Sequence, residues 1–323
     1  MRIIDFHNHY YPPAYLDALR EADSAVQVTI DEDGNPRLYY PGDYNIAVPG
    51  HRDIDYREQV LKDLGIDTQV LTLTTPGTHV ETPARAARLA SLVNDAFADV
   101  VRSKGGRFTA LATLPLNDPA ASTKELERSM HDLGLRGAML FSNVNGVGLN
   151  DDRFLPLYEA ADALGAVLYI HPTNPVGVEA MTDFWLMPLV GFLMDTTLAA
   201  AKIVFSGIPE RLPRIRWVLC HMGGAIPYLA ERLDRGFEAF VECRANIPRK
   251  PSEYLRQFYF DTVNFEPRAL ELAISFAGVD HILAGSDYPH QIGSIPKMLE
   301  MLKEHPQQKA ILGGNAERLL GAV

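Results

Sequence analysis

The chain has 323 residues, of which 47% are hydrophobic and 22% are charged, and its formal net charge at pH 7 is −11. This composition is typical of a soluble globular protein that buries a sizeable core, either as one large α/β domain or as two ordinary domains. The negative charge argues against nucleic acid and anionic membranes as partners.

Targeting and membrane segments are not expected. The N-terminus lacks a basic region followed by an apolar run, so we expect no signal peptide. The longest apolar stretch, near residues 184–205, contains Asp195 and Lys202, which argues against a membrane span. The two cysteines, Cys220 and Cys243, cannot form a disulfide framework, and a cytoplasmic location is predicted.

A short apolar run opens the chain and ends in His7-Asn8-His9. Alternate side chains of a strand share a face, so both imidazoles can bind one metal ion, although this pair alone is weak evidence. Residues 10–55 are polar and rich in turns, and we interpret them as an insertion after the first strand. Within it, Val26–Ile30 and Arg37–Tyr40 are predicted to pair as a hairpin.

Strands and helices then alternate regularly. Eight short strands, apolar on both faces, are typical of a buried parallel sheet, and eight βα units favour a distorted (β/α)₈ barrel in a single domain of residues 1–323. An open doubly wound sheet is the alternative. The strands are predicted at Ile3–Phe6, Thr68–Leu73, Arg107–Thr113, Gly137–Phe141, Ala166–His171, Arg216–His221, Phe258–Thr262 and His281–Gly285. The helices are predicted at Tyr56–Leu64, Pro83–Ser103, Pro119–Leu133, Arg153–Leu164, Thr182–Phe205 (a largely apolar helical insertion after strand 5), Ala225–Ala239, Pro267–Phe276, Ile295–Lys303 and Gln307–Leu320.

Potential metal and acid/base groups collect at the carboxyl ends of four predicted strands, where barrel active sites lie. The first strand leads to His7 and His9, the fifth ends at His171, the sixth at His221, and the eighth at Asp287. Each residue alone has a structural explanation, such as a turn or a helix N-cap. Their shared position in one barrel instead predicts a metal site.

With these motifs in place, the chain resembles the metal-dependent amidohydrolase superfamily, in the branch of aminocarboxymuconate-semialdehyde and γ-resorcylate decarboxylases. Matching motifs run along most of the chain outside residues 10–55. They are Asp5-Phe6-His7-Asn8-His9, Leu111-Ala112-Thr113-Leu114-Pro115, Ile170-His171-Pro172, Phe184-Trp185-Leu186, Leu189-Val190-Gly191, Thr196-Thr197, Cys220-His221-Met222-Gly223-Gly224-Ala225 and Leu283-Ala284-Gly285-Ser286-Asp287-Tyr288-Pro289.

The resemblance implies that His7, His9, His171 and Asp287 bind one divalent metal, with His221 as a catalytic residue beside it. Asp287 can act both as a ligand and as a proton carrier. Binuclear members carry a lysine at the end of strand 4, where this chain has Ser142-Asn143, so a mononuclear site is expected. Three imidazoles and one carboxylate suit zinc, with manganese as the alternative.

Substrate contacts also follow from the resemblance. Arg232 matches an arginine that reaches the substrate carboxylate of a neighbouring subunit, and Trp185 is assigned to substrate binding within its motif. A second family arginine aligns with Asn45, and none of Arg37, Arg52 or Arg57 aligns in its place. The arginine in trans and the apolar surface of Phe184–Phe205 predict a homodimer.

The sequence therefore predicts a metal-dependent, non-oxidative decarboxylase that acts on a small aromatic or unsaturated carboxylic acid. A hydrolase or hydratase that acts on a lactone, amide or double bond has the same ligands and is the second hypothesis. A non-catalytic binding protein on a retained barrel is a third, and the presence of all five site residues argues against it.

Overall fold

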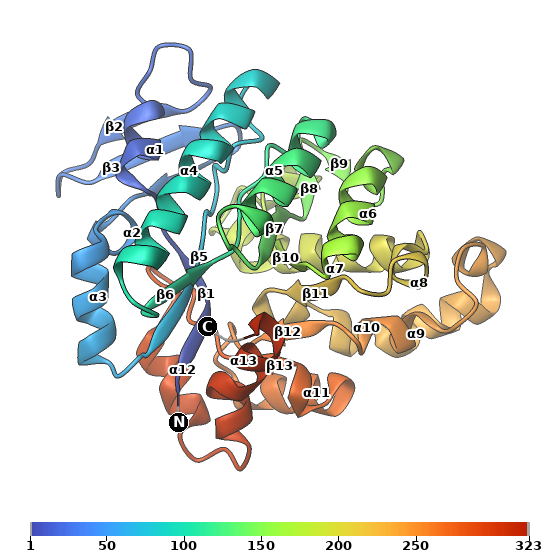
Figure 1. The fold of residues 1–323 in the computed structure, drawn as a ribbon. Helices are drawn as coiled ribbons and strands as arrows, with labels where there is room; N and C mark the ends of the chain where they lie inside the picture. Colours follow the sequence, from blue (N-terminus) through green and yellow to red (C-terminus); the bar gives the residue numbers. More distant parts are fainter. Residues whose placement is uncertain (1, 322–323) are drawn as a thin grey trace.

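A closed barrel of eight parallel strands forms the centre of the computed structural model, which describes residues 2–321 (Figure 1). One part of the barrel has the strand order β1-β5-β6, and the other has the order β13-β12-β11-β10-β7. Two bridges join the parts, between Asn8 and Tyr288 and between Ala112 and Ala138. The N–H of Phe6 donates to Ala284 O at 2.8 Å and that of Met139 to Ala112 O at 2.9 Å. These bonds exclude the open sheet and confirm the barrel.

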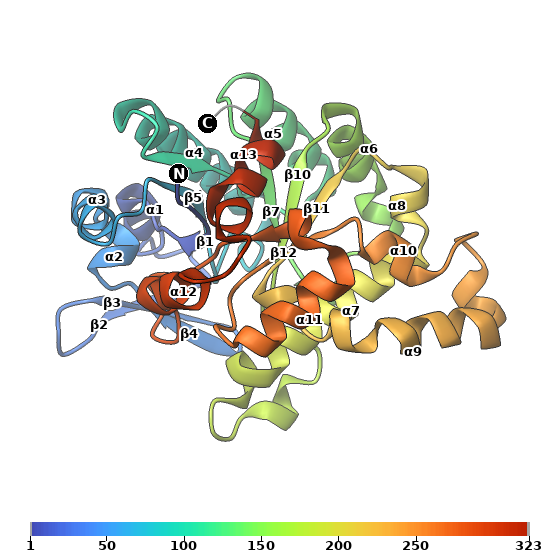
Figure 2. The ribbon, with the colours of Figure 1, turned by 90° about the horizontal axis from the view of Figure 1, so that it is seen from below.

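All eight barrel strands are almost entirely buried, as their apolar sequences predict. Figure 2 shows the helices as an outer layer around the strands. The barrel strands are β1 (Ile4–His9), β5 (Thr68–Thr72), β6 (Phe108–Ala110), β7 (Gly137–Phe141), β10 (Val167–His171), β11 (Arg216–Leu219), β12 (Tyr259–Asp261) and β13 (Ile282–Leu283). The main helices are α3 (Ile54–Asp63), α4 (Pro83–Ser103), α5 (Pro119–His131), α6 (Leu155–Leu164), α7 (Phe192–Phe205), α9 (Ile226–Ala239), α11 (Pro267–Ala277), α12 (Ile295–Leu302) and α13 (Asn315–Leu320). Shorter elements are β8 (Asn143–Val144), β9 (Val147–Gly148), α8 (Ile208–Arg211) and α10 (Pro251–Leu255).

The insertion after β1 contains a small antiparallel sheet. Its strands β2 (Gln27–Ile30) and β3 (Pro36–Tyr40) form the predicted hairpin, and β4 (Asp43–Ile46) adds a third strand that the sequence analysis missed. Two short helices, α1 (Pro13–Ala18) and α2 (Pro49–Arg52), were also missed. The β4 sequence Asp-Tyr-Asn-Ile has no clear apolar alternation, because all four of its residues are only partly buried.

The segment between β10 and α7 differs from its prediction. A helix was expected from Thr182, but Phe184 and Trp185 have left-handed backbones, with φ of 53° and 57°. Continuous helix therefore starts only at Met187, with a π-helical turn at Met187–Gly191 before α7. This left-handed turn breaks the helix because two consecutive positive φ angles cannot belong to a right-handed helix.

Met187–Phe205 is long and apolar enough, by length and composition alone, to cross a membrane. In the fold, however, it connects β10 to β11 on the outside of the barrel, as Figure 2 shows. Its Ala200, Ile203 and Val204 side chains are buried in the core, and its exposed side chains include Leu198. This helix is therefore one of the barrel's outer helices, packed on one side only.

Candidate metal centre

Four side chains from three places in the chain converge at the carboxyl end of the barrel. His7 and His9 project from β1, His171 ends β10, and Asp287 follows β13. One ligand atom of each residue lies within 4.8 Å of all the others, and all four residues are buried. The Nε2 atoms of His7 and His9 are 3.2 Å apart, and each lies 3.3 Å from Asp287 Oδ1.

Hydrogen bonds at Nδ1 determine how these imidazoles face the centre. His7 Nδ1 contacts Asp261 Oδ2 at 2.6 Å, and His171 Nδ1 contacts the carbonyl oxygen of Pro172 at 2.9 Å. His9 Nδ1 contacts Thr72 Oγ1 at 3.0 Å, whose hydroxyl already donates to the carbonyl of Asn8. Because every Nδ1 faces an acceptor, each carries the proton in a neutral ring, and the Nε2 lone pairs are left to bind a ligand.

The four residues fit one divalent cation. Asp287 Oδ1 is buried and has no hydrogen-bond partner among the described residues, although two Nε2 atoms lie beside it. A buried carboxylate oxygen facing imidazole lone pairs is unfavourable unless a cation lies between them. Within residues 2–321, this is the one group of at least three such side chains close enough to hold an ion together.

The local charges agree with this fit. Burial lowers the pKa of His9 to about 3 and the pKa of His171 well below its usual value, so both rings are neutral. Burial also opposes protonation of His7, but the carboxylates of Asp261 and Asp287 outweigh it and raise its pKa to about 10. Burial opposes ionisation of Asp287, yet the charge of His7 and the neighbouring imidazoles of His221 and His9 hold its pKa well below the usual range. A proton on His7 therefore occupies the place that a metal cation would take.

His221 lies beside this group and outside it. Its Nε2 is 3.9 Å from Asp287 Oδ2, and its ring centroid lies 4.9 Å from that of His7. The backbone of His221 is left-handed, with φ of 52°, in a turn that continues to Gly224. A Cβ at Gly224 would overlap the carbonyl oxygen of Leu193, so this glycine allows the turn to lie against α7.

A second metal has no ligand at the end of β7, where Ser142 and Asn143 follow the strand. Ser142 Oγ and Asn143 Nδ2 both donate to Asp195 Oδ2 of α7, and the Asn143 bond is 2.9 Å long. These two side chains are therefore engaged in a structural network, which agrees with the predicted mononuclear site.

Asp261 has a larger role than its sequence position indicated. Its buried carboxylate accepts from Tyr169 Oη at 2.7 Å and from the N–H of Val263 at 2.9 Å, in addition to its contact with His7. Its position at the end of the seventh predicted strand was the only sequence signal for this role.

The sequence analysis missed two further histidines. His290 lies next to His9, and His51 lies next to His290, each with ring centroids 5.0 Å apart.

The three arginines considered as replacements for Asn45 each make contacts within the protein. Arg57 is fully buried and donates to Asn8, Gln69, Gly50 and His9. Arg52 donates to Ala47 O and Asn35 Oδ1, and Arg37 donates to Tyr39 and lies over the Tyr44 ring. Asn45 itself donates to Tyr11 and Thr75. Arg57 and Arg52 are therefore held by other protein groups, whereas the buried Nε of Arg37 has no hydrogen-bond partner among the described residues.

The two predicted substrate contacts, Arg232 and Trp185, are both exposed at the surface. Arg232 is exposed on α9, which begins at Ile226, and forms no ion pair among the described residues. Trp185 is 58% exposed, and its ring lies 5.7 Å from that of Tyr44 in the insertion.

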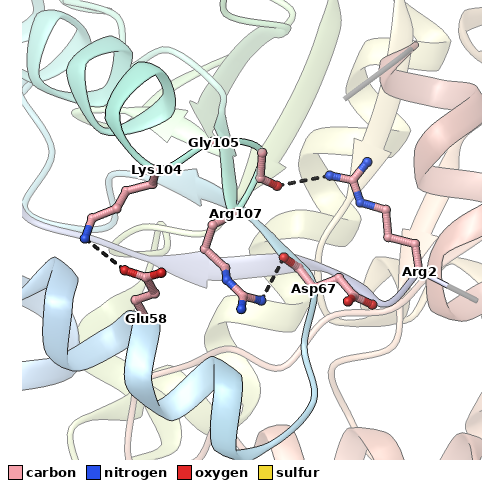
Figure 3. Close-up of a pocket in the computed structure, with 7 residues that line it drawn as sticks. Arg2, Glu58, Asp67, Lys104, Gly105 and Arg107 are labelled. Carbon is pink, nitrogen blue, oxygen red and sulfur yellow. Dashed lines mark hydrogen bonds and ion pairs between the residues drawn. The ribbon is translucent and has the colours of Figure 1, made fainter.

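A surface depression at the opposite, amino-terminal end of the barrel is lined mainly by charged residues, whose cations contact carboxylates or backbone carbonyls around it (Figure 3). Lys104 contacts Asp55 and Glu58, Arg2 donates to Gly106 O at 3.0 Å, and Arg107 donates to Asp67 O at 3.0 Å. These cations link the chain segments at this end of the barrel, so we assign the depression a structural role. The barrel rule likewise places function at the other end.

The fold and site together define a barrel enzyme whose catalytic centre holds a single metal ion at the carboxyl ends of its strands. The chain belongs to the amidohydrolase family, whose model matches residues 4–322.

Several similar proteins are decarboxylases. The chain is 32% identical to 2-amino-3-carboxymuconate-6-semialdehyde decarboxylase of Dictyostelium discoideum, over 98% of this chain and 91% of that protein. It is also 32% identical to a γ-resorcylate decarboxylase of a Rhizobium species, over 78% and 82% of the two chains. The structure of 5-carboxyvanillate decarboxylase from Sphingomonas paucimobilis matches with a TM-score of 0.86 and 28% identity, over 100% and 99%. A dihydroxybenzoic acid decarboxylase from Polaromonas, solved with manganese and the inhibitor 2-nitroresorcinol, matches with a TM-score of 0.82 and 25% identity, over 99% and 97%.

Proposed function

We propose that this protein is a metal-dependent decarboxylase that releases carbon dioxide, without redox change, from a small aromatic or unsaturated carboxylic acid. The convergence of His7, His9, His171 and Asp287 on one point, with His221 beside them, carries this proposal. Relatives that cover nearly the whole chain are decarboxylases, which favours this reaction over a hydrolase or hydratase with the same ligands.

The proposed site residues have separate roles. His7, His9, His171 and Asp287 would hold the ion, which we propose to be zinc, with manganese as the alternative. When bound, a divalent ion polarises an oxygen of the substrate next to the carboxylate that leaves. His221 donates a proton to the ring or chain carbon, the carbon–carboxylate bond breaks to release carbon dioxide, and solvent returns a proton to His221. Asp287 Oδ2, 3.9 Å from His221 Nε2, stabilises the protonated imidazole between turnovers.

The surroundings complete the proposal. We propose a cytoplasmic location, because both cysteines are free thiols. We also propose a homodimer in which Arg232 of each subunit binds the substrate in the site of the other. We further propose that Trp185, whose ring contacts Tyr44 of the insertion, binds the substrate.

A carbon dioxide release assay tests this function. Protein loaded with zinc or manganese is incubated with a panel of hydroxybenzoic, methylsalicylic and muconic acids. We expect release with at least one acid, and loss of release in metal-free protein and in His171→Ala, which lacks a proposed ligand.

Turnover of lactones or amides without carbon dioxide release would instead support the hydrolase. Absence of turnover across all panels, with the metal bound, would contradict enzymatic function and favour a binding protein.

A further inference from the structure

The proposed metal site spans the seam where the first and last strands of the barrel meet. Two of its ligands come from β1, and a third follows β13. Beyond the short β13, backbone bonds cross this seam: the N–H of Asp287 donates to His7 O at 2.8 Å, and the N–H of His9 donates to Tyr288 O at 2.9 Å. The alignment of β1 with the chain after β13 therefore sets how His7, His9 and Asp287 lie relative to one another.

The backbone of Asp287 has an uncommon conformation at this seam. Its φ is 58°, in the left-handed region that a residue with a Cβ rarely adopts. Such a conformation persists only where the surrounding structure holds it in place. The residues on either side of Asp287 are joined, because the N–H of Tyr288 donates to Ser286 Oγ at 3.2 Å. Contacts that hold Ser286 therefore also hold the direction of the Asp287 carboxylate.

Ser286 is held by Asp5, which lies near the start of β1. The Asp5 carboxylate accepts the Ser286 N–H on Oδ1 at 3.0 Å and the Ser286 hydroxyl on Oδ2 at 2.6 Å. Both residues are fully buried. Hydrogen bonds to a carboxylate are stronger than those between neutral groups. This pair of bonds links the strand that carries His7 and His9 to the segment that carries Asp287, and it involves none of the proposed ligands.

Asp5 is itself held from the opposite side. Gln69 of β5 donates from Nε2 to Asp5 Oδ2 at 2.7 Å, and its Oε1 accepts from Arg57 Nη1 at 2.8 Å. Arg57 also donates to the carbonyl oxygen of His9. Because a guanidinium only donates and a carboxylate only accepts, the Gln69 amide has one orientation between them. The buried chain of side chains from Arg57 through Gln69 and Asp5 to Ser286 therefore has a single hydrogen-bond direction.

We propose that Asp5 is a positioning residue, which acts through Ser286 to hold the Asp287 carboxylate beside His7 and His9. Asp5 itself contacts neither the ion nor the substrate. This inference rests on the proposed function, and it adds a residue to which that function assigns no role. Loss of the Asp5–Ser286 bonds should give a folded protein that binds its metal weakly.

Metal affinity, measured by competition for zinc between the protein and a coloured chelator, tests this inference. Ser286→Ala removes the hydroxyl and keeps the charge of Asp5. We expect its zinc affinity to fall about 10–100-fold, the usual effect of removing a group that orients metal ligands. The visible absorption spectrum of the cobalt-loaded variant should also change, because a shifted Asp287 alters the ligand geometry. Asp5→Asn should weaken zinc at least as much, because its amide places a donor where an acceptor is needed.

The chain offers a matched control on the outside of the barrel. Ser252 of α10 donates its N–H at 3.0 Å and its hydroxyl at 2.7 Å to the two carboxylate oxygens of Asp234 in α9, and both residues are buried. Ser252→Ala therefore removes the same kind of bond, from a pair that contacts no proposed ligand. Urea denaturation should show similar losses of stability in Ser252→Ala and Ser286→Ala, while Ser252→Ala should bind zinc as wild type does.

Two results would overturn the role of Asp5. If Ser286→Ala lost stability but kept the zinc affinity and the cobalt spectrum of wild type, the contact would be structural alone. If only Asp5→Asn lost affinity, Asp5 would act through its charge and not through Ser286. Ser286→Cys, which has a weaker donor of similar size, should bind zinc with intermediate affinity. It provides the measurement if Ser286→Ala does not fold, and wild-type affinity in Ser286→Cys would then overturn the inference.

The wild-type protein separates this inference from the function on which it rests. Tight zinc binding by wild type and by every variant would contradict the role of Asp5 and leave the proposed function intact. Absence of zinc and manganese binding by wild type would contradict the metal site, and with it both the proposed function and this inference.

Discussion

Asp261, Thr72 and the carbonyl of Pro172 each accept a hydrogen bond from the Nδ1 of one proposed ligand. These acceptors select the tautomer of each ring, so that all three Nε2 atoms present a lone pair to the same point. At the residue scale, the metal site therefore depends as much on these neighbours as on the ligands. His221 differs, because its Nδ1 lies 3.0 Å from the thiol of Cys220, a weak partner, and its Nε2 lies outside the ligand group.

We predict that His221→Asn keeps its metal but loses activity. A positioned acid/base group typically contributes about 10²–10⁴-fold to the rate, and His221 lies outside the four proposed ligands. Elemental analysis and carbon dioxide release on the same samples check this. If metal and activity were lost together, His221 would be a ligand.

Asp261→Asn should weaken metal binding about 10–100-fold, because it removes the carboxylate that orients His7. The pH dependence of metal affinity should change as well. Asp261 and Asp287 raise the pKa of His7 to about 10, so at neutral pH a proton must leave before a metal binds, and wild-type affinity should rise with pH up to that value. With Asp261 neutral, the pKa of His7 falls and this slope should diminish.

A competition titration with a coloured chelator between pH 6 and pH 9 measures both effects. Tyr169→Phe, which removes a hydrogen bond to Asp261 but leaves the carboxylate, is the matched control and should show a smaller loss. An unchanged affinity in Asp261→Asn would show that the carboxylate does not orient the ligand.

At the scale of elements, α7 connects the outer layer to the strand ends. Asp195 of α7 accepts from Ser142 and Asn143 after β7, while the N–H of Ala225, after the His221 turn, donates to Thr197 Oγ1 of α7 at 2.8 Å. The N–H of Ser142 in turn donates to the carbonyl of His171 at 2.8 Å. One helix therefore holds both the His171 strand end and the His221 turn in place.

We predict that Asp195→Ala lowers the free energy of unfolding by about 2–3 kcal/mol, because two buried donors lose a charged acceptor. Lys202→Ala, an exposed position on the same helix, should change it by less than about 0.5 kcal/mol. Urea denaturation followed by circular dichroism measures both. Equal stabilities of the two variants would show that the Asp195 contacts do not stabilise the fold.

At the scale of the whole molecule, large apolar side chains remain exposed on the segment that leads into α7 and on α7 itself. Phe184 is 86% exposed, and Leu189, Met194 and Leu198 are each at least 44% exposed. Tyr228, near the start of α9, is also exposed, and α9 lies beside α7 in Figures 1 and 2. Extended apolar surfaces of this kind usually mark an interface, and Arg232 lies on the same helix as Tyr228.

We predict that two inactive variants, His221→Asn and Arg232→Ala, complement each other in mixed dimers. Each mixed dimer would have one site with both lesions and one intact site. After dissociation and random reassociation, half of the dimers are mixed, so activity should return to about a quarter of wild type. If the protein sediments as a monomer, or if activity does not recover after mixing, Arg232 is a surface charge with no role in the active site.

Local patterns in the sequence were sufficient for the barrel and for the shared location of five potential site residues, while the assignment of four of them as metal ligands came from the family resemblance and stays a prediction. Strand and helix periodicity is a local property of the sequence. Because barrel sites lie at the carboxyl ends of the strands, the predicted strand ends are expected to bring together His7, His9, His171, His221 and Asp287. The predicted helix over Pro83–Ser103 and the predicted strand over Gly137–Phe141 have the same bounds in the structure.

Only the tertiary structure decided which side chains surround those ligands. Asp261 ends β12, His51 lies in α2 and His290 lies in the loop after β13, and nothing in their local sequence indicates which ring or carboxylate they face. The left-handed backbone at Phe184 and Trp185 was equally hidden, because neither residue is a glycine. Contacts between distant segments depend on how the barrel closes, with Asn8 beside Tyr288 and Ala112 beside Ala138, and this closure brings His290 against His9.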